Sequence, residues 1–132
     1  MTTTASFLTV PEVCDIHLYQ LEHFGGMSGT REPNLLTSAV AMPEMSFGGE
    51  LLHRDLFEMA AAYLFHLVQN HPFLDGNKRT GAMAALVFLD LNGVEFTATE
   101  DEFTAMVLAV ASGQMEKPEI ARFLQAHCAT QG

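Results

Sequence analysis

Residues 71–81 read His71-Pro72-Phe73-Leu74-Asp75-Gly76-Asn77-Lys78-Arg79-Thr80-Gly81, and they separate two apolar, helix-like segments at 54–70 and about 78–92. Within a few positions the stretch gathers an imidazole, a carboxylate, a glycine–asparagine turn, two adjacent cations and a hydroxyl. A hydrophobic core does not accommodate this mixture, because each buried polar group without a partner costs about 1–3 kcal/mol. We therefore interpret the stretch as an active-site loop that handles phosphate.

Each polar group of this loop suits one part of phosphate chemistry. The turn at 76–77 starts the next helix with free backbone N–H groups, and such a helix N-terminus attracts anions. Lys78 and Arg79 add positive charge where a phosphate would lie. Asp75 has no cysteine or second histidine close by in the sequence, so it suits a hard cation such as Mg²⁺ better than zinc. His71 can take up a proton near neutral pH.

A structural alternative exists for the same loop, in which it only caps two helices. His71 would then bond to backbone groups, and Lys78 and Arg79 would be solvated. His71 taken alone fits this alternative, whereas the complete string of polar groups favours the chemical interpretation. Phe73 is structural in both cases, because a single aromatic ring among polar neighbours is expected to insert into the core and anchor the loop.

The loop resembles the motif of the Fic/Doc family, usually written His-Pro-Phe-x-[Asp/Glu]-Gly-Asn-x-Arg. Its fixed positions are all met, by His71, Pro72, Phe73, Asp75, Gly76, Asn77 and Arg79. Family members that transfer AMP usually carry Gly after the Asn and a second Arg three residues beyond the first, whereas this chain has Lys78 and Ala82. The Asn-Lys-Arg-Thr run is instead similar to the Doc-type, or death-on-curing, toxins. Further similar segments cover most of the chain: Phe24-Gly25-Gly26, Asp55 to Glu58, Leu86 to Leu89, and Asn92-Gly93-Val94.

The resemblance implies a transferase that uses ATP and Mg²⁺ and modifies a hydroxyl group of a protein. His71 would remove the proton from that hydroxyl, and Asp75 would hold the metal that bridges the phosphates. The loop N–H groups would neutralise the transferring group together with Gly76, Asn77, Lys78 and Arg79. The resemblance also implies a single Fic/Doc domain over residues 1–132, with its motif loop at 71–81 and a flap at 44–50.

Lys78 and Ala82 bear on which group is transferred. A glycine in place of Lys78 would leave space for the distal phosphates, as in an AMP-transferring enzyme, whereas a lysine side chain partly fills that space. Ala82 stands where such an enzyme has the second arginine, which contacts the same phosphates. Both departures favour the Doc arrangement, in which the nucleotide is reversed and the γ-phosphoryl group is transferred. We therefore expect a protein kinase of unusual fold, a toxin that blocks translation through a target such as elongation factor Tu. Transfer of AMP is the alternative, and a non-catalytic module that only binds an antitoxin is a third interpretation.

Control by a second chain follows from a pattern that is missing. Many Fic proteins carry an inhibitory helix written [Ser/Thr]-x-x-x-Glu-[Gly/Asn], whose Glu pairs with the motif Arg. Three serine–glutamate pairs here have the spacing but the wrong following residue: Ser28–Glu32 before Pro33, Ser46–Glu50 before Leu51, and Ser112–Glu116 before Lys117. We therefore expect an antitoxin in trans, with a partly disordered segment that folds in a groove beside the motif.

Composition indicates a small folded domain in a reducing compartment, and we expect a cytoplasmic protein. The 132 residues are 48% hydrophobic, and the net charge of −10 argues against direct nucleic-acid binding. We expect no signal peptide, because the first ten residues lack a charged segment and a long apolar run, and the longest apolar run, 82–89, is far short of the ~20 residues that span a membrane. Cys14 and Cys128 are expected to be free thiols.

Hydrophobic periodicity predicts an all-α fold of about six helices around one buried central helix, with at most a small β-hairpin flap. Residues 77–92 are apolar on nearly every face, which is typical of a central helix. Thr9 with Glu12 and Thr99 with Glu102 are capping-box pairs that start two of the helices. The other helical ranges are expected at 35–42, at 54–70 and from 118 onward. Residues 94–96 are expected to be extended, between the central helix and the helix that starts at Thr99.

The remaining segments carry weaker signals. Residues 1–8 are expected to be a loose end. Residues 44–50 are either a surface loop or the flap, which in Fic proteins aligns the target chain by β-augmentation. Arg31 is one of four arginines, and we expect it to form a surface salt bridge or, alternatively, to contact substrate. His17, His23 and His66 are expected to be surface or packing histidines.

Overall fold

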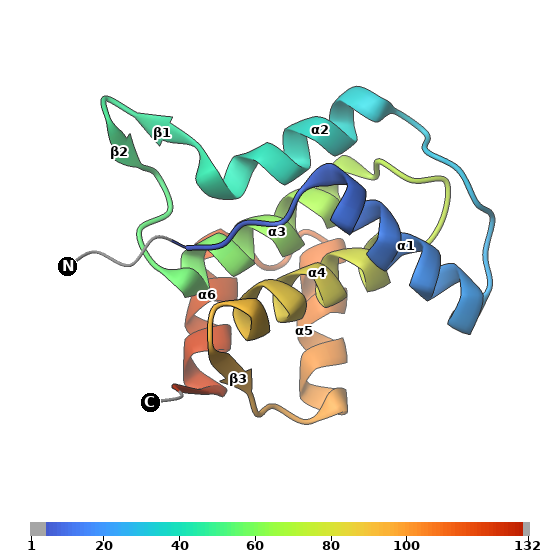
Figure 1. Ribbon diagram of the computed structural model, residues 1–132. Helices are drawn as coiled ribbons and strands as arrows, with labels where there is room; N and C mark the ends of the chain where they lie inside the picture. The colour runs from blue at the N-terminus through green and yellow to red at the C-terminus, as the bar shows by residue number, and fades with distance from the viewer. Residues whose placement is uncertain (1–4, 131–132) are drawn as a thin grey trace.

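The computed structural model describes residues 5–130, and this part of the chain folds into six helices and four short strands (Figure 1). Two antiparallel pairs, β1–β2 and β3–β4, form the sheets. The predicted helical class is therefore confirmed, with helix ends displaced by a few residues. The elements are α1 (Val10–Phe24), α2 (Pro33–Ala41), the 3₁₀ turn η1 (Met42–Glu44), β1 (Ser46–Phe47), β2 (Glu50–Leu51), α3 (Leu56–Asn70), α4 (Asn77–Leu91), β3 (Val94–Phe96), α5 (Glu100–Ala111), α6 (Lys117–Ala126) and β4 (Cys128–Thr130).

Local sequence signals explain where several helices begin. Both predicted capping boxes form, with Thr9 accepting a hydrogen bond from the Glu12 amide at 3.3 Å and Thr99 from the Glu102 amide at 3.1 Å. Asp55 caps α3 in a similar way, by accepting from the Glu58 amide at 2.8 Å. None of the helices described here is both long and apolar enough to cross a membrane.

The centre of the molecule is shared by α3 and α4. The expected central helix, 77–92, is α4, but α3 contacts α2, α4, α5 and α6 and is enclosed at least as completely. The two helices approach closely at Gly81, where an added Cβ would lie 3.0 Å from a Val68 methyl and 3.2 Å from the Leu64 carbonyl oxygen. The other face of α4 is only half buried, because Met83 and Leu86 border a cavity.

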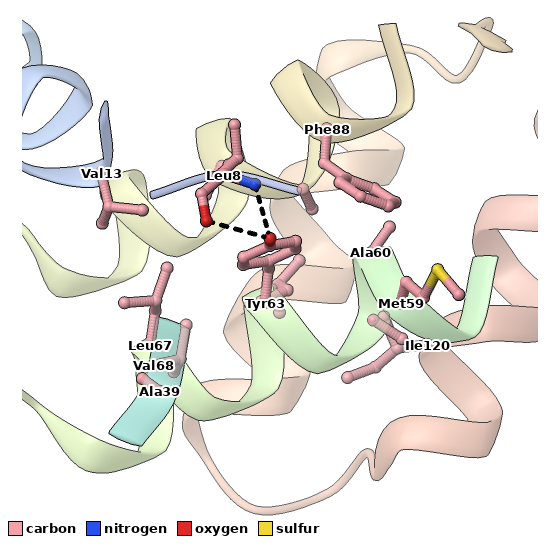
Figure 2. Close-up of a cluster of buried hydrophobic side chains, with 14 of the residues drawn as sticks. Leu8, Val13, Ala39, Met59, Ala60, Tyr63, Leu67, Val68, Phe88 and Ile120 are labelled. Atoms are coloured by element: carbon pink, nitrogen blue, oxygen red, sulfur yellow. Dashed lines mark hydrogen bonds between the residues drawn. The ribbon is translucent and has the colours of Figure 1, made fainter. Parts of the chain in front are cut away.

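The segment before α1 lies on the core, so the expectation of a loose end is wrong for residues 5–8; residues 1–4 lie outside the described range. The Leu8 amide donates to the Tyr63 hydroxyl at 2.8 Å, and the Leu8 side chain is buried (Figure 2). Phe7 stacks on Phe88 with ring centroids 5.8 Å apart. Burial raises the pKa of Tyr63 to about 12, so its hydroxyl stays protonated at any physiological pH.

β1 and β2 form a hairpin where a flap or surface loop was expected at 44–50. Ser46 pairs with Leu51 and Phe47 with Glu50. Gly48 and Gly49 have φ values of 61° and 84°, a turn conformation that favours glycine. The hairpin projects beyond α2 (Figure 1), and the Phe47 side chain at its tip is 81% exposed.

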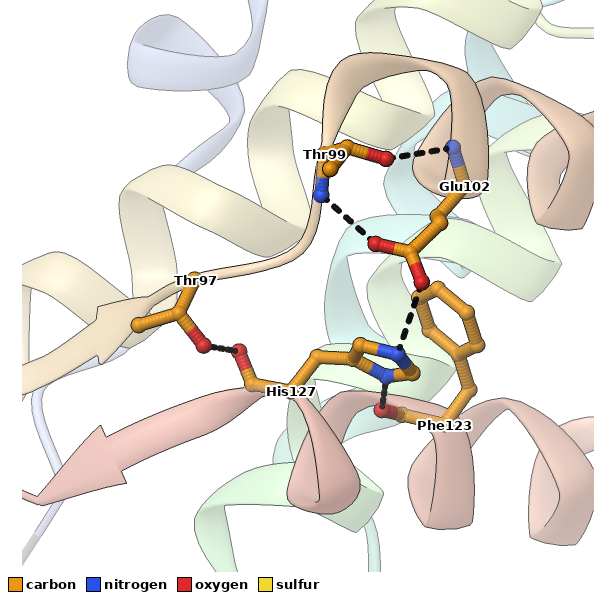
Figure 3. Close-up of polar contacts among 5 residues, drawn as sticks. All are labelled: Thr97, Thr99, Glu102, Phe123 and His127. Atoms are coloured by element: carbon orange, nitrogen blue, oxygen red, sulfur yellow. Dashed lines mark hydrogen bonds and ion pairs between the residues drawn. The ribbon is translucent and has the colours of Figure 1, made fainter.

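β3, which covers the segment expected to be extended at 94–96, pairs with β4, a strand that was not predicted from the sequence. Contacts of His127, just before β4, fix this corner (Figure 3). Its carbonyl oxygen accepts from the Thr97 amide and hydroxyl, both at 2.6 Å, and its Nε2 lies 3.5 Å from a Glu102 carboxylate oxygen. Cys14 and Cys128 are free, as expected.

Candidate active site

The motif loop begins where α3 ends. His71 is the C-cap of α3 and adopts a left-handed conformation, with φ 50° and ψ 53°. Within residues 5–130 it is the one non-glycine residue with a positive φ. Its side chain is exposed, so the ring is not held by burial in the core. The backbone at this residue therefore sets the direction in which the imidazole leaves the protein surface.

Asn77 closes the loop from inside. Its Oδ1 accepts from the Phe73 amide at 2.9 Å, and its Nδ2 donates to the Phe73 carbonyl oxygen at 3.0 Å. These two backbone partners fix which end of the side-chain amide is nitrogen. The same Nδ2 lies 3.2 Å from His71 Nδ1, so Nδ1 must accept and the neutral ring carries its proton on Nε2. In this arrangement the basic atom of His71 is Nδ1, and a base reaction at Nε2 requires the ring to turn over.

His17 and Phe73 hold the other side of the loop. Phe73 is buried, and the His17 imidazole stacks on it with ring centroids 3.7 Å apart and planes 6° apart. The Nε2 of His17 donates to the Asp75 carbonyl oxygen at 2.8 Å. His17 was expected to be a surface or packing histidine. It packs, and it also fixes the backbone on which Asp75 is placed.

Asp75 presents a carboxylate at the loop surface. Its two oxygens accept from the Gly76 amide at 3.1 Å and from the Met27 amide at 3.2 Å. Gly26 approaches so closely that an added Cβ would lie 3.1 Å from the Asp75 Oδ2 atom. No group of three or more His, Cys, Asp or Glu side chains able to hold a metal occurs among residues 5–130. One carboxylate suits Mg²⁺ delivered with phosphates, because Mg²⁺ commonly takes one or two protein carboxylates and completes its shell with phosphate and water.

Gly76 is the N-cap of α4 and has φ 79°, and no side chain caps the first turn. The first-turn N–H groups of α4 are therefore available to an anion. Lys78 and Arg79 are both exposed in this turn. The Arg79 guanidinium lies over the Phe24 ring at 4.5 Å from the centroid, a cation–π contact that holds it at the rim.

A cavity of about 800 Å³ opens beside the loop. His71, Asp75 and residues 76–79 line its polar end. Its apolar wall comes from α4 and α5 and includes Met83, Leu86, Phe103, Val107 and Leu108. This volume falls in the range of small-molecule sites, roughly 300–1,000 Å³. The combination of a basic, donor-rich end and an apolar wall suits a nucleotide.

Arg31 is the largest departure from the sequence expectations for the site. It was expected to form a surface salt bridge or to contact substrate; the salt bridge does not form within residues 5–130, and contact with substrate stays a prediction. Its Nε instead donates to the His71 carbonyl oxygen at 2.7 Å, and its Nη2 donates to the Asn70 carbonyl oxygen at 2.9 Å. The sequence marks Arg31 by the scarcity of arginines, but it cannot reveal carbonyl partners some 40 residues away.

The Fic/DOC family model matches residues 7–89, which is more than half of the chain and includes the whole motif loop. The chain belongs to the Fic/Doc family. The match also covers the three residues of α1 and the following loop that support the motif, His17, Phe24 and Arg31. It ends before α5, so this part of the cavity wall is outside it.

Two curated proteins are similar to this Fic/Doc chain. Toxin Doc of Mycolicibacterium smegmatis is 44% identical over 78 residues, which are 59% of this chain and 60% of that protein, so the match spans less than two thirds of the relative. Protein kinase doc of Escherichia phage P1 is 29% identical over 114 residues, which are 86% of this chain and 89% of that protein.

A second group of polar side chains lies away from the motif, between the base of the hairpin, α3 and α6. The Lys117 ammonium lies 3.0 Å from His66 Nε2 and 3.3 Å from His53 Nε2. Burial, followed by the charge of Lys117, lowers the pKa of His66 to about 4 and also lowers that of His53. Both rings are therefore neutral acceptors at neutral pH, and His66 is a packing histidine, one of the two possibilities expected for it.

Proposed function

We propose that this chain transfers the γ-phosphoryl group of ATP to a hydroxyl group of a protein, as a Doc-type toxin. The observation that carries the proposal is the complete motif, with Lys78 after Asn77, arranged at the uncapped N-terminus of α4 beside a nucleotide-sized cavity. The similarity to proteins named Toxin Doc and Protein kinase doc supports it. We further propose elongation factor Tu as the target, so that translation would stop.

The residues of the loop divide the work as follows. His71 accepts the proton of the target hydroxyl on Nδ1, and because Nδ1 has one lone pair, its contact with Asn77 Nδ2 must be released as the hydroxyl binds. The target oxygen bonds to the γ-phosphorus while the bond from that phosphorus to the β-phosphate oxygen breaks, and ADP leaves. Asp75 would hold Mg²⁺, which when bound offsets the negative charge of the phosphates. Lys78, Arg79 and the first N–H groups of α4 bind the phosphates. Phe73 anchors the loop. The Asn77 side chain keeps the loop closed, and the Asn77 backbone N–H group, in the first turn of α4, faces the anion.

We propose that residues 1–132 form a single domain, that its hairpin aligns the target, and that a separate protein inhibits it. The hairpin β1–β2, the flap expected at 44–50, would pair with an extended segment of the target. A separate antitoxin would fold a segment into a groove beside the motif. Transfer of AMP is less well supported, because Lys78 and Ala82 replace the residues that seat the distal phosphates in AMP-transferring relatives.

A binding measurement and a mass measurement test this proposal together. ATP with Mg²⁺ should raise the melting temperature of the purified chain, since a ligand that binds only the folded state stabilises it. Incubation with elongation factor Tu should then add the mass of a phosphate group to the factor. His71→Ala should keep the thermal shift, because Lys78, Arg79 and the first N–H groups of α4 are the groups proposed to bind the phosphates. It should lower transfer about 10²–10⁴-fold, the usual contribution of a general base. The absence of any thermal shift would favour a non-catalytic antitoxin-binding module.

A further inference from the structure

Arg31 holds the backbone where α3 passes into the motif loop. Besides the two side-chain bonds to the carbonyl oxygens of Asn70 and His71, its own amide donates to the Pro72 carbonyl oxygen at 2.7 Å. One residue thus binds three consecutive carbonyl groups. The neighbouring pairing of Thr30 with Phe73 keeps the two segments antiparallel.

These carbonyl groups need a partner. Asn70 is the last residue of α3, and the final carbonyl oxygens of a helix accept no hydrogen bond from an N–H group of that helix. The end of a helix also carries partial negative charge, which a guanidinium complements. A left-handed conformation such as that of His71 is rarely adopted by residues other than glycine, and it persists where surrounding contacts impose it. Arg31 supplies such contacts on both sides of the His71 peptide.

We propose that Arg31 is a positioning residue for the transfer reaction, which acts by fixing the backbone of His71. The His71 ring is exposed, so its direction depends on the backbone and on the single contact from Asn77 Nδ2 to Nδ1. A turn of the backbone at residue 71 would carry the ring away from Asn77 and from the hydroxyl it serves. This inference rests on the proposed role of His71 as the base.

The guanidinium is the chemically suitable group for this role. Its planar fork places two donors, Nε and Nη2, on two adjacent carbonyl oxygens. A lysine ammonium keeps the charge but is a single flexible centre that cannot hold both oxygens in one plane. Among residues 5–130, no carboxylate lies within ion-pair distance of Arg31, so a salt bridge is not what places this side chain.

The test compares Arg31→Lys with a matched control, Arg122→Lys, which changes an exposed arginine on α6 away from the motif loop. Arg31→Lys should lower kcat about 10–100-fold, the cost of a displaced catalytic group, while the affinity for ATP with Mg²⁺ stays unchanged. Arg122→Lys should leave both unchanged. A higher KM for the target protein with an unchanged kcat would instead show that Arg31 contacts substrate, and would overturn the proposal.

Coupling to His71 separates positioning from a general structural effect. In a His71→Ala background, Arg31→Lys should cause no further loss, because residues that act as a unit are not additive. An equal loss in both backgrounds would overturn the proposal. Independently of activity, Arg31→Lys should shift the ¹⁵N signals of the His71 ring, and unchanged signals would also overturn it. If His71→Ala itself retained the parent rate, the proposed base would fail, and these signals would still decide the role of Arg31.

Discussion

At the scale of single residues, the sequence predicts which side chains gather in the loop beside the cavity, but not the residues that support the loop. The identity and order of residues 71–79 indicate a phosphate site because each side-chain type suits one task at adjacent positions. Arg31 and His17 act on the same loop through main-chain carbonyl oxygens. A carbonyl has no sequence signature, so the partners of these two residues could only come from the folded chain.

Lys78 carries the residue-scale prediction about which group is transferred. Lys78→Gly should sharply lower phosphoryl transfer, because a full charge is lost from the first turn of α4 and the nucleotide is seated differently. AMP transfer need not appear, since Ala82 still stands where the second arginine would be. Initial rates on a common target measure the effect, with Arg122→Gly, the loss of an exposed cation on α6 outside the motif cavity, as the control. A parent-like rate for Lys78→Gly would contradict the reversed-nucleotide argument.

At the scale of elements, helices with apolar periodicity and caps were predictable, and short strands were not. The capping boxes at Thr9 and Thr99 form as expected, because Thr and Glu three residues apart satisfy each other locally. β4 depends on β3, a partner some 30 residues earlier in the chain, and carries no local signal. The sequence also did not predict that α3 is buried as completely as α4, because α3 has polar positions whereas α4 is apolar on nearly every face.

The contact between α3 and α6 should make stability depend on pH. His66 accepts from Lys117 as a neutral ring, and its pKa falls from an ordinary 6.5 to about 4 on folding. Between these two pH values the unfolded chain binds more protons than the folded chain. The contribution of His66 to the free energy of unfolding should therefore be fully present above about pH 6.5 and decrease as the pH falls toward 4. His53 should contribute in the same direction, while Glu58 partly opposes it.

Denaturant unfolding at several pH values measures this dependence. His66→Gln keeps an acceptor for Lys117 but cannot be protonated, so it should flatten the curve between pH 6.5 and 4 relative to the parent. The same substitution at exposed His23 on α1 serves as the control and should leave the curve unchanged. If the free energy of unfolding varied with pH in the same way for the parent and for His66→Gln, protonation of His66 would not be the cause of the pH dependence.

At the scale of the whole molecule, we expect the activity to be inhibited by a second chain. The 132 residues contain no complete copy of the inhibitory pattern, and we propose that an antitoxin supplies the inhibition. Expression of this chain alone should therefore stop bacterial growth, and a small neighbouring gene product should restore growth by binding it directly. His71→Ala should be harmless yet still bind that product. A chain that is active on ATP in vitro but harmless alone, with no partner present, would indicate a housekeeping modifier.

The proposed transfer of the γ-phosphoryl group is tested most directly by following each phosphorus of ATP. The chain, Mg²⁺ and elongation factor Tu, or in parallel the total protein of a bacterial host, are incubated with ATP labelled at the γ or at the α phosphorus. The prediction is protein-bound label from γ-labelled ATP only, and its loss with His71→Ala. Label that arrives from α-labelled ATP would show AMP transfer, and label from neither would show that the loop is not an active transferase; either result would contradict the claim.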